Sequence, residues 1–305
     1  MIQMTKVNVG SPICIAATGD ACGEGILWQA ATESVYWTDI NRFLVHRYSS
    51  VDRAIRTWYF SEPVTCVLST VHKDTLALVM GSSVVFWNPA TDARHPPIFH
   101  LPDWPAVRCN DAAVDPNGDL WVGSMRNNVG ESGESSDAGG NDGVLYRVSI
   151  TGEVKEFQRN IGISNTLVWS PDDSRFYFGD TLQNQIWQYN YDLEDGSIGS
   201  RKPFFQDFDR GLPDGSAIDI AGYLWNCRYG GGCIVRVDPN GEVDMVVEVP
   251  VSNPTNCTFG GIDGTTLFVT SASADPGKWE RFGGCLFALD TDIRGKTDGV
   301  LRTCT

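Results

Sequence analysis

Four polar residues that lie far apart in the sequence share one local context. Each stands at the start of an apolar run that leads into a turn and then into an aromatic-containing run; they are Glu24, Asn110, Asn165 and Asp214. Two carboxylates and two carboxamides are all oxygen donors, which suit hard divalent cations such as Ca²⁺, Mg²⁺ or Mn²⁺. None of the four histidines lies at such a position, so a histidine-rich zinc site is not expected. Because Asn and Asp also cap turns at strand ends, the fold must bring these residues together for a site to exist.

Arg108 adds a cationic group to this set. It opens the stretch RCNDAAVDPNGDLWVGSM (108–125), two residues before Asn110. A guanidinium presents forked donors that could hold sugar hydroxyls or a developing oxyanion. The alternative is a structural ion pair, and the sequence leaves both readings open.

Other catalytic arrangements find little support in the sequence. There is no GxSxG motif for a serine nucleophile. Cys109 has no histidine nearby in sequence, which favours a buried strand thiol. The glycines at 230–232 precede no helix pattern, so a tight turn is favoured over a phosphate cradle.

A repeated hairpin pattern supplies the elements that must position these residues. Six copies, roughly 40 to 55 residues apart, each join an apolar run, a turn rich in Asp, Gly, Asn or Pro, and an aromatic run; they begin at Glu24, Thr65, Asp111, Asn165, Asp214 and Asn256. Six units of about four strands predict an all-β protein, a six-bladed β-propeller with four-stranded blades that forms a single domain over residues 1–305. A β-sandwich or two all-β domains is the alternative.

The pattern also predicts where the blades begin and end. Outer strands are expected at 57–60, 97–101 and 246–249, and the run VNVGSPICIAAT (7–18) is expected to add the outer strand of the last blade and close the ring. A Gly-, Ser- and acid-rich stretch at 127–143 predicts a long loop within blade three. Since the innermost strand of each blade lines the central channel, the polar residues that open the repeats should meet at one end of it.

Composition excludes several partners. The formal net charge of −15 argues against nucleic acid and against anionic membrane surfaces. No apolar stretch approaches 18 residues, and the N-terminus lacks a signal-peptide pattern. Nine cysteines without a CxxC pair are typical of reduced thiols. We therefore expect a cytoplasmic protein that acts on a small molecule, with no nucleic-acid or membrane partner; the oligomeric state stays open.

Four motifs carry a resemblance to a known family. They are GEGILW (23–28), RCNDAAVDPNGDLWVGSM (108–125), GISNTLVWSPDDSRFYFGDT (162–181) and LPDGSAIDIAGYLWNCRYGGGCIVRVDPNG (212–241). As a set they resemble the family of senescence marker protein (regucalcin), gluconolactonase and related sugar-acid lactonases. That family is a six-bladed propeller with one divalent metal in its channel, which agrees with the repeat count.

The resemblance implies a role for each candidate residue. It implies that Glu24, Asn165 and Asp214 bind the metal, that Arg108 and Asn110 face the substrate, and that Asp214 also acts as the catalytic base. The expected reaction is divalent-metal-dependent hydrolysis of an aldonolactone such as glucono-, xylono- or arabinonolactone, with Ca, Mg, Mn, Zn or Fe as the ion. The alternatives are a metal-dependent phosphotriesterase or esterase, and a calcium-binding regulator without enzymatic activity.

The chain departs from the family pattern beside the third repeat. Some members carry a substrate-binding carboxylate two or three residues after the GSM motif, where this chain has Asn127 and Asn128. The long loop that follows is not universal in the family either. Both departures bear on the choice of substrate rather than on the metal.

Overall fold

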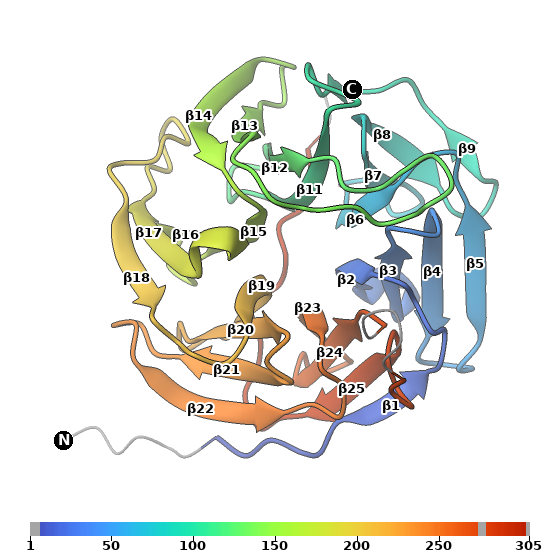
Figure 1. Ribbon diagram of the computed structural model, residues 1–305, viewed down its shortest axis with the longest axis vertical. Helices are drawn as coiled ribbons and strands as arrows, with labels where there is room; N and C mark the ends of the chain where they lie inside the picture. The colour runs from blue at the N-terminus through green and yellow to red at the C-terminus, as the bar shows by residue number, and fades with distance from the viewer. Residues whose placement is uncertain (1–6, 274–278, 303–305) are drawn as a thin grey trace.

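Six antiparallel sheets surround a central channel in a computed structural model that describes residues 7–273 and 279–302 (Figure 1). Each sheet is one blade, with its first strand at the channel and its last at the rim. The prediction of a six-bladed β-propeller with four-stranded blades is confirmed. Within the described residues, helical structure consists of two three-residue 3₁₀ turns, η1 (Ala30–Thr32) and η2 (Thr181–Gln183).

The strands follow the chain from the channel outward in five of the blades. Blade one contains β2 (Gly23–Gln29), β3 (Ser34–Asp39), β4 (Leu44–Ser49) and β5 (Ile55–Tyr59). Blade two contains β6 (Val64–Ser69), β7 (Leu76–Met80), β8 (Ser83–Asn88), the short β9 (Ala93–Arg94) and β10 (Phe99–His100). Blade three contains β11 (Val107–Val114), β12 (Leu120–Arg126), β13 (Gly143–Val148) and β14 (Val154–Ile161). Blade four contains β15 (Ser164–Trp169), β16 (Arg175–Asp180), β17 (Gln185–Asn190) and β18 (Lys202–Gln206). Blade five contains β19 (Leu212–Ile218), β20 (Leu224–Tyr229), β21 (Cys233–Val237) and β22 (Val243–Glu248).

The last blade is completed by the start of the chain. It contains β23 (Pro254–Gly260), β24 (Thr266–Ser271), β25 (Leu286–Asp290) and, at the rim, β1 (Ile13–Ala16). β1 pairs antiparallel with β25, with Ile13 opposite Ala288. The predicted closure by the N-terminal run is confirmed, and the three predicted outer strands correspond to β5, β10 and β22.

The turns inside the blades use aspartate in two ways at once. Asp115 accepts hydrogen bonds from the backbone of Asn117 and Asp119 through one oxygen and from Trp121 Nε1 through the other. Asp219 does the same in blade five, with Trp225 as the indole donor. The aspartate thus fixes the turn and accepts a hydrogen bond from a buried indole N–H, so the DPNG turn has a structural role in its blade.

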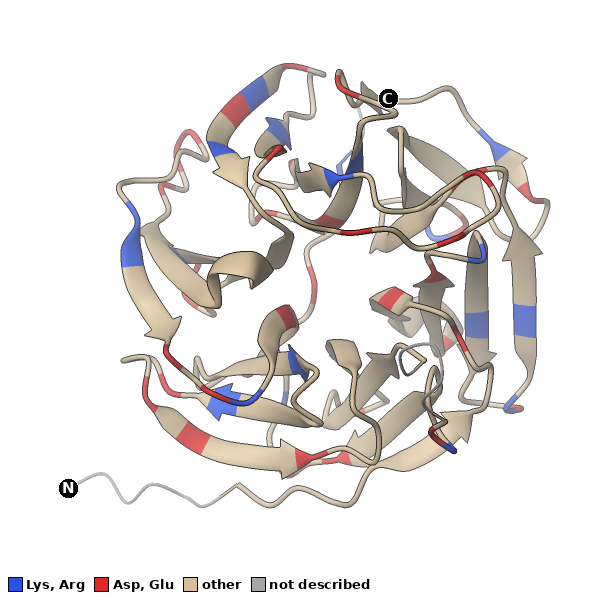
Figure 2. Ribbon diagram, viewed as in Figure 1, with Lys and Arg blue, Asp and Glu red and all other residues tan. Residues whose placement is uncertain are grey.

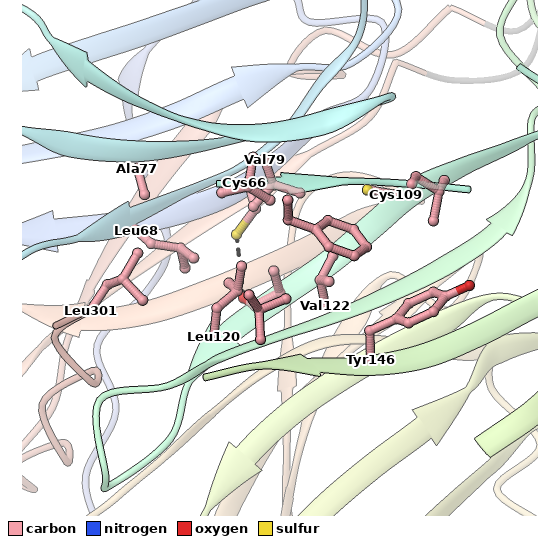
Figure 3. Close-up of a cluster of buried hydrophobic side chains, with 14 of the residues drawn as sticks. Cys66, Leu68, Ala77, Val79, Cys109, Leu120, Val122, Tyr146 and Leu301 are labelled. Carbon is pink, nitrogen blue, oxygen red and sulfur yellow. Dashed lines mark hydrogen bonds between the residues drawn. The ribbon is translucent and has the colours of Figure 1, made fainter. Parts of the chain in front are cut away.

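Apolar side chains fill the space between neighbouring blades. Figure 3 shows the contact between blades two and three, where Cys66, Val79, Leu120 and Val122 pack together with Leu301 from the C-terminal segment. The Cys66 thiol also donates to the carbonyl of Ala112, 3.4 Å away on the next blade. Because each blade is apolar on both faces, it is stable only between two others, which favours the closed ring. The eight cysteines within the described residues are free thiols.

All six inner strands carry a register irregularity at the same level. The shifts fall between Glu24 and Leu27, Val64 and Cys66, Cys109 and Ala112, Asn165 and Val168, Pro213 and Ser216, and Pro254 and Cys257. A bulge re-aims the side chains beside it, and here it turns the polar residues of each repeat into the channel. At Gly25 the backbone has φ +52°, and an added Cβ would lie 2.2 Å from Thr65 O, so only glycine fits.

The C-terminal segment closes one end of the channel. Figure 1 shows it crossing the ring behind the inner strands. Gly295 bridges to Asp219, and Leu301 bridges to Thr70. Between this segment and the bulges lies a cavity of about 230 Å³, lined by apolar and polar side chains of the inner strands, with Asp111, and by Lys296 and Asp298 of the C-terminal segment. Among the residues described, no helix has the length and apolar character needed to cross a membrane.

Candidate functional site

Two carboxyl groups from opposite parts of the sequence meet in the channel. Glu24 on β2 and Asp214 on β19 lie within hydrogen-bonding reach of each other. Figure 2 shows the acidic segments of β2 and β19 at the inner edge of the ring. Burial raises the pKa of both groups, and the charge of Glu24 raises the pKa of Asp214 further, well above its usual range. Two enclosed carboxyl groups at this separation share a proton or require a cation between them.

The side chain of Asn165, on β15, is held in one amide orientation. Its Nδ2 donates to Thr181 Oγ1 at 2.8 Å, and the Thr181 hydroxyl in turn donates to Pro213 O at 2.8 Å. Because the hydroxyl proton is used on Pro213, Thr181 acts as acceptor for Asn165, which fixes the amide orientation. From the residues that the structure describes, the Oδ1 atom of Asn165 receives only a long contact of 3.5 Å from Asn110, so it is left available as a ligand.

The backbone beside this amide is strained. Thr166 has φ +57°, a left-handed conformation that is rare for a β-branched residue. Its hydroxyl donates to the backbone carbonyl of Asp214 at 2.7 Å, which ties β15 to β19. Strain of this kind is kept where the surrounding contacts fix a functional geometry.

Arg108 and Asn110 form a network next to these groups. Arg108, which is 5% exposed, donates from Nη1 to Asn110 Oδ1 at 2.6 Å, and Asn110 Nδ2 donates to Ser164 O at 2.8 Å. Burial lowers the pKa of Arg108 to about 10, which leaves it charged at neutral pH. The five residues predicted from the sequence are therefore brought together at one end of the channel. Arg108 forms no ion pair with a carboxylate in the described part of the chain, so the structure does not favour the ion-pair reading.

The predicted loop of blade three reaches over this end of the channel. Figure 1 shows it leaving β12 and crossing above β6. Asn41 of blade one donates to Gly133 O at 2.9 Å and to Ser135 Oγ at 3.0 Å, which anchors the loop on the far side. At its base, Asn128 Oδ1 accepts two bonds from Arg108.

Three supporting residues escaped the sequence analysis. Asn256 on β23 donates from Nδ2 to Glu24 Oε2 at 2.9 Å, and Thr181 orients Asn165 as described. Asp111 follows Asn110 on β11, and burial together with the Glu24 carboxylate raises its pKa to about 8. Asn256 begins the last repeat copy, so its equivalence to the other four positions was a usable signal. Thr181 gives no such signal because it lies outside the inner strands.

The donor set fits one divalent cation. Glu24 and Asp214 supply two facing carboxylates, and Asn165 supplies an oriented amide oxygen. All three are oxygen ligands of the kind that Ca²⁺, Mg²⁺ and Mn²⁺ prefer. No cluster of three or more His, Cys, Asp or Glu side chains suited to a metal occurs in residues 7–273 and 279–302. The third oxygen ligand offered here is the amide of Asn165.

Known proteins show the same sequence pattern and the same ring. Residues 22–273 match the family model described as SMP-30/Gluconolactonase/LRE-like region. A pentonolactonase of Haloferax volcanii is 31% identical over 93% of this chain and 96% of its own length. A 6-deoxy-6-sulfogluconolactonase of Pseudomonas putida is 29% identical over 92% and 95%. A solved structure of a calcium-binding protein, regucalcin, from Agrobacterium tumefaciens superposes with a TM-score of 0.88 at 24% identity. The match covers 96% of this chain and 98% of that chain, so the two share the fold.

Proposed function

Because the chain belongs to the SMP-30/gluconolactonase/LRE-like family, we propose that it is an enzyme that hydrolyses a sugar lactone with the help of one divalent cation. The observation that carries this proposal is the meeting of Glu24, Asn165 and Asp214 in the channel, beside Arg108. Two enclosed carboxylates and an oriented amide oxygen favour the binding of a cation at this place. A charged arginine next to them gives a substrate oxygen a partner.

Each residue has a distinct part in this proposal. Glu24, Asn165 and Asp214 would hold the cation, which when bound would polarise the ester carbonyl and stabilise negative charge on its oxygen. Asp214 would also accept a proton from the attacking water as general base. Arg108 and Asn110 would orient the sugar through its oxygen atoms. Water adds to the carbonyl carbon and the bond to the ring oxygen breaks. The ring oxygen would take the proton that Asp214 accepted from the water and so leave as a hydroxyl group of the sugar acid.

The test is a panel of five- and six-carbon aldonolactones, assayed by acid release with Ca²⁺, Mg²⁺, Mn²⁺, Zn²⁺ and Fe²⁺ in turn. We expect turnover of at least one lactone, loss of activity of about 100-fold or more after chelation, and recovery when an ion is returned. Full activity in a sample shown to be metal-free by elemental analysis would exclude the cation. Turnover of phosphotriesters or simple esters without any lactone would favour the esterase alternative.

Thr181 provides a prediction about the amide ligand. Thr181→Val removes the acceptor for Asn165 Nδ2 while keeping the volume, so the amide loses its fixed orientation. We expect the affinity for the divalent ion to fall by about 10- to 100-fold, the usual effect of losing a group that orients a ligand. Isothermal titration calorimetry of the chelated protein measures it. An unchanged ion affinity in a folded variant would show that Asn165 needs no such support or binds no ion.

A further inference from the structure

Arg108 is an enclosed cation whose acceptors are all neutral. It donates to Asn128 Oδ1 from Nε at 3.1 Å and from Nη2 at 2.8 Å, to Cys109 O at 3.0 Å and to Asn110 Oδ1. These bonds use four of the five guanidinium N–H groups, and no described residue accepts from the fifth. The Glu24 carboxylate acts on this charge only through space, and no described carboxylate hydrogen-bonds to the guanidinium. This position therefore favours a ligand that brings a negative charge to the unused N–H group.

Other enclosed arginines of the chain are arranged differently. Arg236 pairs with Asp219 and Asp244, and Arg147 pairs with Asp119. Arg228 has no carboxylate partner within the described residues, but its guanidinium lies over the rings of Phe205 and Phe208 and donates to five oxygen atoms. Within the described residues, Arg108 has neither a hydrogen-bonded carboxylate nor a ring under its guanidinium, so one of its N–H groups remains available to a ligand.

The orientation of the Asn128 side chain adds further hydrogen-bond donors beside Arg108. Because Arg108 offers only donors, the Oδ1 atom of Asn128 must face it and the Nδ2 group must face away. No described residue accepts a hydrogen bond from that Nδ2 group. A carboxylate at this position would neutralise Arg108 and would present only acceptors. Asparagine does the reverse: it leaves the positive charge in place and adds two N–H donors beside it.

The loop fixes the backbone of Asn128 before any ligand arrives. Ser136 N donates to Asn128 O at 2.8 Å, and Val129 pairs with Ser135 to form a small hairpin. Asn41 anchors that hairpin on blade one. Preorganised donors lower the cost of binding an acceptor-rich group. The acidic side chains farther along the loop are exposed, so salt screens their repulsion of an anion more than it screens the attraction of the buried Arg108 guanidinium.

We propose that Arg108 and Asn128 together bind a negatively charged substituent of the sugar, a carboxylate, sulfonate or phosphate, so that the site prefers an anionic lactone and its acid over the neutral analogue. This inference rests on the proposed function for the reaction, but the binding preference stands independently of it. The competing possibility is that Arg108 holds only the reacting carboxyl group, in which case the charge of the substituent is irrelevant.

The experiment compares two lactones that differ only in that substituent. D-glucaro-1,4-lactone carries a carboxylate where D-glucono-1,4-lactone carries a hydroxymethyl group. For the full chain with its best divalent ion, we expect kcat/KM to favour the anionic lactone by about 10-fold or more, and Asn128→Asp to lower that preference by about 30-fold. Calorimetry with D-glucarate and D-gluconate gives the same comparison without turnover.

Asn127→Asp is the matched control. It adds the same charge one residue away, but the Asn127 side chain hydrogen-bonds to Val129 N and Pro105 O and, among the described residues, not to Arg108. We expect the preference to change less than 3-fold in this variant. Equal preference in the wild type and Asn128→Asp, with lactones still hydrolysed, would overturn the anion site and leave the proposed function intact. Tighter binding of D-glucarate that Asn128→Asp abolishes, with no lactone turned over, would support the anion site and overturn the proposed hydrolysis.

Discussion

Asp214→Asn is expected to lower kcat/KM for lactone hydrolysis by about 100-fold or more, because it removes both a charged ligand and the general base. The change keeps the shape of the side chain and an oxygen that can accept from the backbone N–H of Gly215. Thermal unfolding should therefore stay cooperative, and the chelated protein should lose no stability. Steady-state kinetics with a saturating divalent ion measures the loss.

A control separates this effect from a general loss of negative charge. Asp209 lies five residues earlier and is exposed, so Asp209→Asn removes one carboxylate without touching the channel. We expect that variant to keep its activity within about 2-fold. Turnover by Asp214→Asn above one tenth of the wild-type rate would assign the base to another group, with Asp111 as the next carboxyl along the channel.

The ring was predictable from sequence because its unit is local. Each repeat is marked by a turn such as DPNG between an apolar run and an aromatic run. A repeat period of roughly 40 to 55 residues is compatible with few folds other than a propeller. Glu24, Asn165 and Asp214 could be grouped for the same reason, since residues at equivalent positions of a repeat must converge on the axis. The N-terminal strand β1 was found by counting, because the last blade lacked an outer strand.

The supporting contacts were not predictable because they join different blades. Thr181 reaches Asn165 only through the turn η2, and Asn256 reaches Glu24 across the seam between the last blade and the first. Both contacts depend on the bulges, whose register has no sequence signature beyond a single glycine such as Gly25. The path of the 127–143 loop was not predictable either, since its anchor across the channel is Asn41, a side chain on another blade.

Glu24→Gln is expected to make the metal-free protein more stable at pH 8 while it abolishes cation-dependent activity. In the metal-free wild type, burial and the Glu24 charge hold the pKa of Asp214 well above its usual value. The folded state then keeps a proton that the unfolded state releases, so stability falls as pH rises from about 4 through the folded pKa. Glutamine removes the charge, can keep the acceptor for Gly25 N and Asn256 Nδ2, and turns a donor toward Asp214.

The measurement is chemical denaturation of wild type and Glu24→Gln in chelator between pH 4.5 and pH 8. Each unit by which the variant lowers the pKa of Asp214 should raise the free energy of unfolding at pH 8 by about 1.4 kcal/mol. The difference between the two proteins should be small at pH 4.5 and grow with pH. Glu153→Gln, an exposed control, should show no such trend. A Glu24→Gln protein that is less stable than wild type at pH 8 in chelator would show that the two carboxyl groups do not repel each other.

A saturating divalent ion should reverse the order of stability. A cation between Glu24 and Asp214 turns their repulsion into two attractions, so it stabilises the wild type by an amount set by its affinity and concentration. Glutamine offers only a neutral oxygen, so the variant gains less. The wild type should therefore be the less stable protein without the ion and the more stable one with it. This reversal would distinguish a carboxylate pair that binds a cation from a pair that has only a structural role. The stability of a purely structural pair would depend on pH but not on the ion.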